Sequence, residues 1–196
     1  MAAVNSTMLP LGTKAPDFRL PSATGGLVSM TDFSDSKGLL VMFICNHCPF
    51  VQHIRQELAA LARAYQRQGI AVVAINANNW EAYPDDSPEQ MAREAERYSY
   101  TFSYLYDESQ KTAREYQAAC TPDFYLFDPD RRLVYRGQFD DSRPGNGLPV
   151  TGKDLCAALD ALLKGDAIPS DQKPSIGCNI KWRPGNEPEY FTKAAN

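Results

Sequence analysis

Two cysteines separated by two residues stand where an apolar run gives way to an amphipathic pattern, and this junction constrains the fold more than any other stretch. The residues before it, 39–44, are continuously apolar and predict a buried strand. After it, apolar side chains recur at helical spacing, at Val51, Ile54, Leu58, Leu61 and Ala62. We therefore expect Cys45 in a strand-to-helix turn and Cys48 in the first helical turn.

The start of a helix is a chemically special place for a thiol. It offers unpaired backbone N–H groups and the positive end of the helix dipole, and both stabilise an anion. We therefore expect a lowered pKa at Cys45, which makes it a nucleophile. Cys45 can then attack a disulfide, and Cys48 can resolve the mixed disulfide. A partly cationic His47 would stabilise the thiolate further; alternatively, His47 is a solvated turn residue.

A metal site is the competing interpretation of the same residues. Cys45 and Cys48, together with His47 or His53, could bind zinc or copper. Structural zinc takes four ligands, and the other cysteines supply no second C-x-x-C pair. We therefore expect redox chemistry that needs no metal and no organic cofactor.

Composition limits the remaining classes. The formal net charge is −4 and no basic tract occurs, which argues against nucleic acid or an anionic membrane surface as partners. The acidic pairs Asp85-Asp86 and Asp140-Asp141 are interpreted as solvated loops.

No signal-peptide pattern or membrane-spanning run is found, so a cytoplasmic location is expected. Five cysteines there favour catalysis or redox sensing over a disulfide scaffold. Oxidising C-x-x-C pairs are common in exported proteins, so a trimmed signal stays an alternative.

The rest of the chain predicts an α/β fold in a single domain, 1–196, with a core at about 10–165. The tail, 166–196, carries Ile176, Ile180 and Trp182 and is expected to pack on that core. After an irregular lead-in over 1–15, the expected elements begin with a hairpin of 17–20 and 27–30, the motif helix ending near Gln68, and a strand at 70–75. They continue with a helix at 87–98, a strand at 104–106, a helix at 108–118, a hairpin of 124–127 and 133–135, and a helix at 151–163.

Two further segments are expected beside the cysteines. Parallel pairing of 39–44 with 70–75 places 76–80, which ends in Trp80, at the Cys45 end of the sheet. Thr121-Pro122 is a candidate cis peptide, which would expose main-chain groups to an incoming peptide or thiol; a trans proline that begins a strand is the alternative. We expect Thr121, Pro122, Asp123 and Trp80 to bind substrate. The loop 137–147 is expected to reach the same end.

Three cysteines lie outside the motif. Cys120 precedes Pro122 by two residues, so it is either an alternative disulfide partner or a buried apolar residue. Cys178 lies in a Ser-Ile-Gly-Cys turn of the tail, and it is either a third redox thiol or a packed residue. Cys156 is interpreted as structural, because nothing near it in the sequence suggests activation.

These features resemble the thioredoxin superfamily, and within it a peroxiredoxin-like (redoxin, alkyl hydroperoxide reductase/thiol-specific antioxidant type) subfamily. The resemblance covers about residues 10–183 and rests on the stretches 45–51, 83–87, 120–123, 140–147 and 175–178. It implies a thioredoxin fold, a central mixed sheet flanked by helices, with an N-terminal hairpin and an inserted helical segment. It also implies Cys45 as the attacking thiol, Cys48 as the resolving thiol, and Pro122 as a cis-proline facing them.

The chain departs from these relatives in two respects. True peroxiredoxins carry a threonine three residues before the peroxidatic cysteine; if Cys48 is that cysteine, the position holds Cys45. No carboxylate adjoins the motif as a base for Cys48, so Asp123 and Asp140 are the candidates.

The leading hypothesis is a thiol–disulfide oxidoreductase acting on protein or small-molecule disulfides with a thiol reductant. The alternatives are a thiol peroxidase acting on hydroperoxides, a metal-binding protein, and a binding module whose affinity a disulfide controls.

Overall fold

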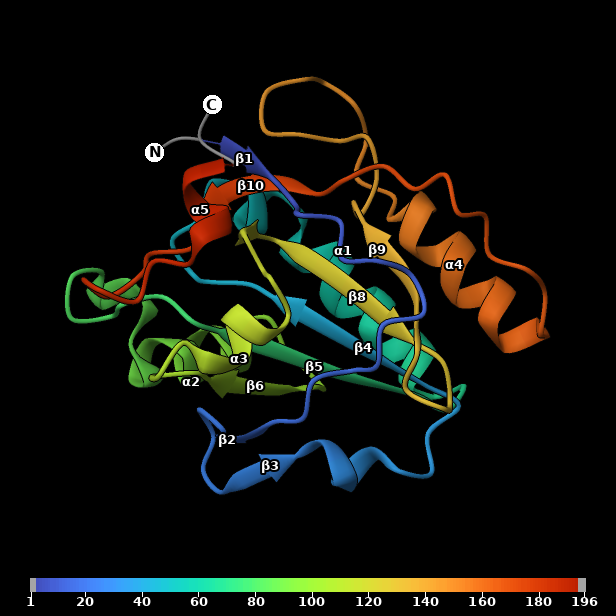
Figure 1. Cartoon of the computed structure of the whole chain (residues 1–196), viewed down its shortest axis with the longest axis horizontal. Helices are drawn as coiled ribbons and strands as arrows, with labels where there is room; N and C mark the ends of the chain where they lie inside the picture. Colours follow the sequence, from blue (N-terminus) through green and yellow to red (C-terminus); the bar gives the residue numbers. More distant parts are fainter. Residues whose placement is uncertain (1–2, 194–196) are drawn as a thin grey trace.

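The computed structural model describes residues 3–193, which surround a five-stranded sheet of order β6-β5-β4-β8-β9 (Figure 1). β4, β5 and β6 are parallel, whereas β8 runs antiparallel to β4 and β9 antiparallel to β8. The strands are β4 (Gly38–Phe43), β5 (Ile70–Asn76), β6 (Ser103–Tyr106), β8 (Asp123–Phe127) and β9 (Leu133–Gly137). This mixed sheet with flanking helices confirms the predicted thioredoxin fold.

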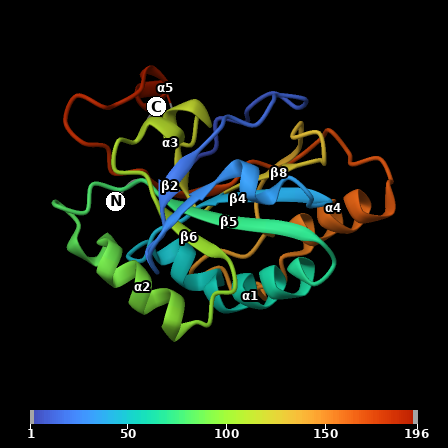
Figure 2. The same ribbon diagram turned by 90° about the horizontal axis from the view of Figure 1, so that it is seen from below.

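Helices cover both faces of the sheet (Figure 2). One face carries α1 (Pro49–Gln66), α2 (Pro88–Arg97) and α4 (Lys153–Lys164); the other carries α3 (Lys111–Glu115) and α5 (Glu189–Lys193). Side chains alternate along β4, so Leu40 and Met42 join the core beneath α1 while Leu39 and Val41 join the opposite core. β4 is therefore buried on both sides, which explains why its sequence is continuously apolar.

The predicted elements are present, with shifts at their ends. β2 (Arg19–Pro21) and β3 (Leu27–Ser29) form the expected hairpin, which the 3₁₀ turn η1 (Met30–Phe33) follows. A second 3₁₀ turn, η2 (Pro84–Asp86), and α2 form the inserted segment between β5 and β6. The helix expected at 108–118 is limited to α3, because Gln110 and Gln117 adopt left-handed backbone conformations on either side of it, with φ of 59° and 50°.

A small sheet of order β1-β10-β7 was not predicted. It consists of β1 (Ala3–Asn5), β10 (Ile176–Asn179) and β7 (Cys120–Thr121), all antiparallel. The lead-in, expected to be irregular, and the tail, expected to pack on the core, therefore each contribute a strand, and β1 and β10 pair next to β7 (Figure 1).

The tail continues from β10 against the main domain. Ile180 and Trp182 are buried in the core opposite α1. Of the predicted domain 1–196, residues 1–2 and 194–196 lie outside the described residues. Among the helices of the described part, none is long and apolar enough to cross a membrane.

Candidate active site

The two cysteines of the motif lie where β4 passes into α1. β4 ends at Phe43, Cys45 lies in the connecting turn, and Cys48 is the N-cap residue of a helix that begins at Pro49. Proline suits that first helical position, since an N–H there would have no partner in the helix. All five cysteines are free thiols, and both Cys45 and Cys48 are buried, with 1% and 0% of their surface exposed.

Thr121 contacts both sulfurs. Its Oγ1 lies 3.3 Å from Cys45 Sγ in a hydrogen bond, and its carbonyl oxygen accepts a hydrogen bond from the Cys48 thiol at 3.0 Å. The Thr121-Pro122 peptide is cis, as predicted. Thr121 therefore holds the two sulfurs against the chain segment that was expected to bind substrate.

That expected substrate surface is closed in this structure. Thr121, Pro122 and Asp123 are all buried, and Trp80 is half-buried against the core beneath α1. Pro122 lines a small pocket together with Phe50 and residues 142–144, so the loop 137–147 does reach this end of the sheet. Of the four expected residues, Thr121 is the one that forms hydrogen bonds with the sulfurs.

The surroundings lower the pKa of Cys48 and raise that of Cys45. The neighbouring thiols of Cys178 and Cys45, with Thr121 and the backbone N–H of Val51, lower the pKa of Cys48, although burial acts in the opposite direction. Burial raises the pKa of Cys45, and the neighbouring Cys48 and Asp86 raise it further. The expected acidification of Cys45 is therefore wrong for this closed arrangement, because burial and the neighbouring Cys48 and Asp86 outweigh the Thr121 hydrogen bond, which lowers its pKa.

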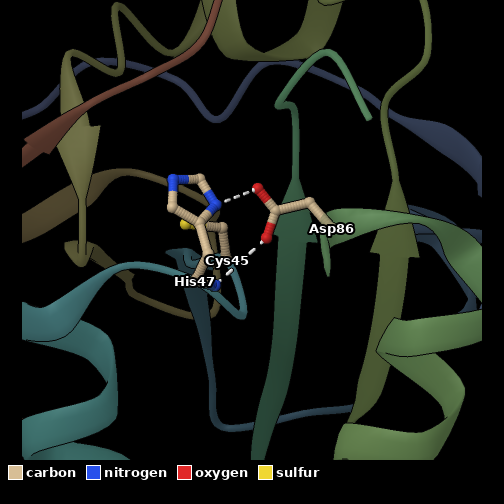
Figure 3. A group of neighbouring side chains, drawn as sticks. All are labelled: Cys45, His47 and Asp86. Atoms are coloured by element: carbon tan, nitrogen blue, oxygen red, sulfur yellow. Dashed lines mark hydrogen bonds and ion pairs between the residues drawn. The ribbon is translucent and has the colours of Figure 1, made fainter. Parts of the chain in front are cut away.

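Asp86 is the main site residue that sequence reasoning missed. Its buried carboxylate accepts hydrogen bonds from the backbone N–H of His47 and from His47 Nδ1 at 2.6 Å (Figure 3). It also accepts hydrogen bonds from the backbone N–H of Asn46 and from Asn78 Nδ2 at 2.7 Å. The expectation that this residue is solvated is wrong. The useful signal was its position after β5, whose carboxyl end lies beside Cys45.

The Asp86 carboxylate also sets the charge of His47. Its hydrogen bond raises the pKa of His47 above 6.5, although burial and the Lys181 charge act in the opposite direction. The imidazole stacks on Tyr83, with ring centroids 5.2 Å apart. His47 is therefore a fixed cation-forming group in the turn between the two cysteines, and not a freely solvated one.

Asp86→Asn is expected to lower the pKa of His47, because the amide keeps the shape of the carboxylate but loses its charge. The raised folded-state pKa means that His47 adds stability below the unfolded-state pKa of about 6.5, and that this stability is lost as pH rises through the folded-state pKa. The variant should lose this pH dependence. NMR titration of His47 and denaturant unfolding across pH measure both effects.

Asp85→Asn is the matched control for this prediction. Asp85 is exposed and contacts Asn46 through its backbone carbonyl, which the substitution keeps. The control should therefore titrate like the wild type. An unchanged His47 pKa in Asp86→Asn would contradict the assignment.

The structure groups possible metal ligands at this site, but Asp86 takes the place of Cys48 in the expected set. One donor atom each from Cys45, His47 and Asp86 lie within 4.8 Å of one another. However, His47 Nδ1 and both Asp86 oxygens are already hydrogen-bonded. A metal at this place would have to replace contacts that shape the turn.

The two acids proposed as bases for Cys48 contact neither sulfur. Asp123 accepts hydrogen bonds from Ser6 and Tyr125, and its burial raises its pKa to about 7. Burial acts against ionisation of Asp140, yet hydrogen bonds, including those from the Thr151 and Gly152 backbone, lower its pKa overall. Asp140 thus anchors the start of α4, and the expectation that it is solvated is wrong.

The accessory cysteines separate into different roles. Cys120 is fully buried and its thiol donates to the Pro122 carbonyl at 3.6 Å; burial raises its pKa. Cys156 is half-buried in α4, where its carbonyl accepts a hydrogen bond from Tyr65. Cys178 lies in β10 directly opposite Thr121, and its thiol interacts with Cys48. Only Cys178 joins the motif cysteines.

Comparison with known proteins identifies a family and several relatives of this chain. Residues 11–136 match the model of the AhpC/TSA family. Thiol-disulfide oxidoreductase ResA from Geobacillus thermodenitrificans is 26% identical over 127 residues, which cover 65% of this chain and 68% of that protein. The chain thus spans about two thirds of the length of the curated relatives that it matches.

Two solved structures are similar over nearly the whole chain. An uncharacterised conserved protein from Geobacillus kaustophilus is 56% identical with a TM-score of 0.92, covering 94% of this chain and 98% of that one. A hypothetical protein from Sinorhizobium meliloti is 55% identical with a TM-score of 0.91, covering 93% and 100%. These two proteins are therefore much more similar in sequence to this chain than the curated relatives are.

Proposed function

This chain belongs to the AhpC/TSA family, and on that premise we propose that it is a thiol–disulfide oxidoreductase whose redox couple is Cys45–Cys48. The observation that carries the proposal is the arrangement of the two buried sulfurs of Cys45 and Cys48 around Thr121 at the start of α1. The name of the ResA relative supports the same class of reaction. Protein or small-molecule disulfides are the proposed substrates.

Cys45 is the proposed attacking thiol because more groups surround the Cys48 sulfur, although both thiols are buried. The Cys48 sulfur neighbours Cys45, Cys178 and the Thr121 carbonyl, whereas the Cys45 sulfur neighbours Thr121 Oγ1 and Cys48. A proton that moves from Cys45 to Cys48 places the negative charge on the attacking sulfur. The pair thus shares one proton, and its titration belongs to both groups.

The reaction then balances as two exchanges. Cys45 thiolate bonds to one substrate sulfur, the substrate disulfide breaks, and the other substrate sulfur leaves as a thiolate that takes the Cys48 proton. Cys48 thiolate next attacks Cys45 Sγ, which forms the Cys45–Cys48 disulfide and releases the reduced substrate. An external dithiol restores the enzyme.

Trapping tests the roles of the two cysteines. In Cys48→Ser, a mixed disulfide between Cys45 and an oxidised protein substrate such as insulin should accumulate, because the resolving thiol has been removed. Non-reducing electrophoresis and peptide mass spectrometry detect the adduct. Cys156→Ser, a substitution in α4, should accumulate none. An adduct on another cysteine, or none in Cys48→Ser, would refute the assignment.

Hydroperoxide reduction is the second candidate. It is favoured by the lowered pKa of Cys48 and by the Thr121 hydroxyl beside Cys45. Arg143 lies near Pro122, but its guanidinium donates to Asp140, Ser142 and Gln138. The Arg143 side chain would therefore not be free to bind the peroxide. Rapid consumption of hydrogen peroxide with dithiothreitol, lost in Cys48→Ser, would favour this function over disulfide reduction.

A further inference from the structure

β10 covers the dithiol at a defined register. It pairs antiparallel with β7, and Cys178 lies opposite Thr121. Thr121 is also the residue that contacts both motif sulfurs. The tail therefore brings a third cysteine to the same residue that holds the first two.

The approach of β10 to β7 is unusually close at Gly177. A Cβ atom added there would lie 2.0 Å from the Thr121 carbonyl oxygen and 2.6 Å from its carbonyl carbon. These are backbone atoms that cannot rotate away, so only glycine permits this approach. The adjacent Cys178 is thereby fixed against the site, with 4% of its surface exposed.

Cys48 neighbours both of the other thiols at the site, those of Cys45 and Cys178. Cys48 and Cys178 belong to one buried core, together with Cys45, and α1 packs against β10. Cys48 interacts with both other thiols, one on the motif side and one on the tail side. The Cys48 sulfur thus has two neighbours with which it could form a disulfide. Cys120, although equally buried, donates its thiol to the Pro122 carbonyl instead.

We propose that Cys178 is a third redox thiol, which exchanges with the Cys45–Cys48 disulfide to form a Cys48–Cys178 disulfide. The proposal rests on the proposed function, since that function generates the first disulfide. In the exchange, Cys178 thiolate attacks Cys48 Sγ, the Cys48–Cys178 bond forms, and the Cys45–Cys48 bond breaks. Cys45 leaves as a thiolate and takes the proton that Cys178 lost, so no external oxidant or reductant is needed.

The exchange has two consequences for the molecule. Cys45 returns to the free thiol form while the disulfide moves to the covered side of the site. The new bond also ties β10 to the start of α1, so the tail cannot leave the dithiol. The oxidised protein would thus hold its disulfide beneath its own tail until a reductant reaches it.

Disulfide mapping tests the proposal without any substrate. The full chain is equilibrated with oxidised glutathione, quenched with acid, alkylated and digested, and the linked peptides are identified by mass spectrometry. The wild type should yield both Cys45–Cys48 and Cys48–Cys178 peptides. In Cys45→Ser, glutathione bound to Cys48 should be displaced by Cys178, which leaves Cys48–Cys178 as the only one of the two. Cys178→Ser should lose that peptide entirely.

Cys120→Ser is the matched control, because it removes another buried thiol next to Thr121 and should keep both disulfides. A stable Cys48–glutathione adduct in Cys45→Ser, with no link to Cys178, would overturn the proposal, as would absence of that link in the wild type. Insulin reduction by the wild type is measured separately. If it fails while the Cys48–Cys178 peptide forms, the proposed function is wrong but the third thiol is real.

Discussion

Cys45→Ser is expected to abolish disulfide reduction, with turnover lower by roughly 10³-fold or more, which corresponds to about 4 kcal/mol of activation free energy. The serine hydroxyl fits the same space but stays protonated near neutral pH, so it cannot attack a disulfide as a thiolate does. Cys48 remains, but its sulfur lies beneath Thr121 and Cys178. Turnover is measured as insulin reduction with dithiothreitol.

Cys156→Ser is the control for this loss. It makes the same chemical change in α4, at a half-buried cysteine apart from Cys45, Cys48 and Cys178. It should reduce insulin at the wild-type rate. If Cys45→Ser keeps even a tenth of the wild-type turnover, then another thiol is the nucleophile and the assignment of Cys45 is wrong.

Gly177→Ala is expected to separate β10 from β7 and to expose the buried thiols. The new methyl group would meet the Thr121 carbonyl at 2.0 Å, far inside contact distance, so one strand must move. Overpacking of this kind costs about 1–3 kcal/mol of unfolding free energy. The diagnostic effect is local: Cys48 and Cys178 should react with iodoacetamide at least about tenfold faster than in the wild type, an effect worth about 1.4 kcal/mol in opening free energy.

Gly165→Ala provides a control that makes the same Gly-to-Ala change without a steric clash. Gly165 ends α4 with a φ of 73°, and open space surrounds the position of its added methyl group. The substitution should therefore lower stability through backbone conformation alone. Its cysteines should stay as protected as those of the wild type. Equal alkylation rates in the two variants would show that β10 does not cover the site.

Local patterns in the sequence were sufficient to predict the framework of the site. The apolar run of β4 and the helical spacing after Cys48 are short-range signals, and they place the two cysteines correctly at the junction. Parallel pairing of β4 with β5 then identifies which loops reach that junction. The cis peptide before Pro122 also followed from the sequence.

The features that could not be predicted from the sequence depend on contacts between residues far apart in the chain. Asp86 is buried because Asn46 and His47 donate hydrogen bonds to it, and no pattern around Asp86 itself reveals those donors. β1 and β10 have three and four residues, too few for a periodic signal, and they pair across almost the whole chain. The prediction of a lowered pKa at Cys45 failed for a related reason: the helix N-terminus was identified correctly, but the burial of Cys45 and the nearby Asp86, which raise its pKa, depend on the fold.

The central claim is that Cys45 and Cys48 form a reversible redox couple, and its reduction potential is the most direct test. The protein is equilibrated in glutathione buffers of graded ratio, and the two thiols are counted by alkylation and mass spectrometry. Because the Cys48 thiolate stabilises the reduced form, we expect a reversible two-electron transition at a potential above the roughly −270 mV of thioredoxin. If Cys45 and Cys48 stay reduced at every ratio, or oxidise without forming a disulfide that includes Cys48, the account is contradicted.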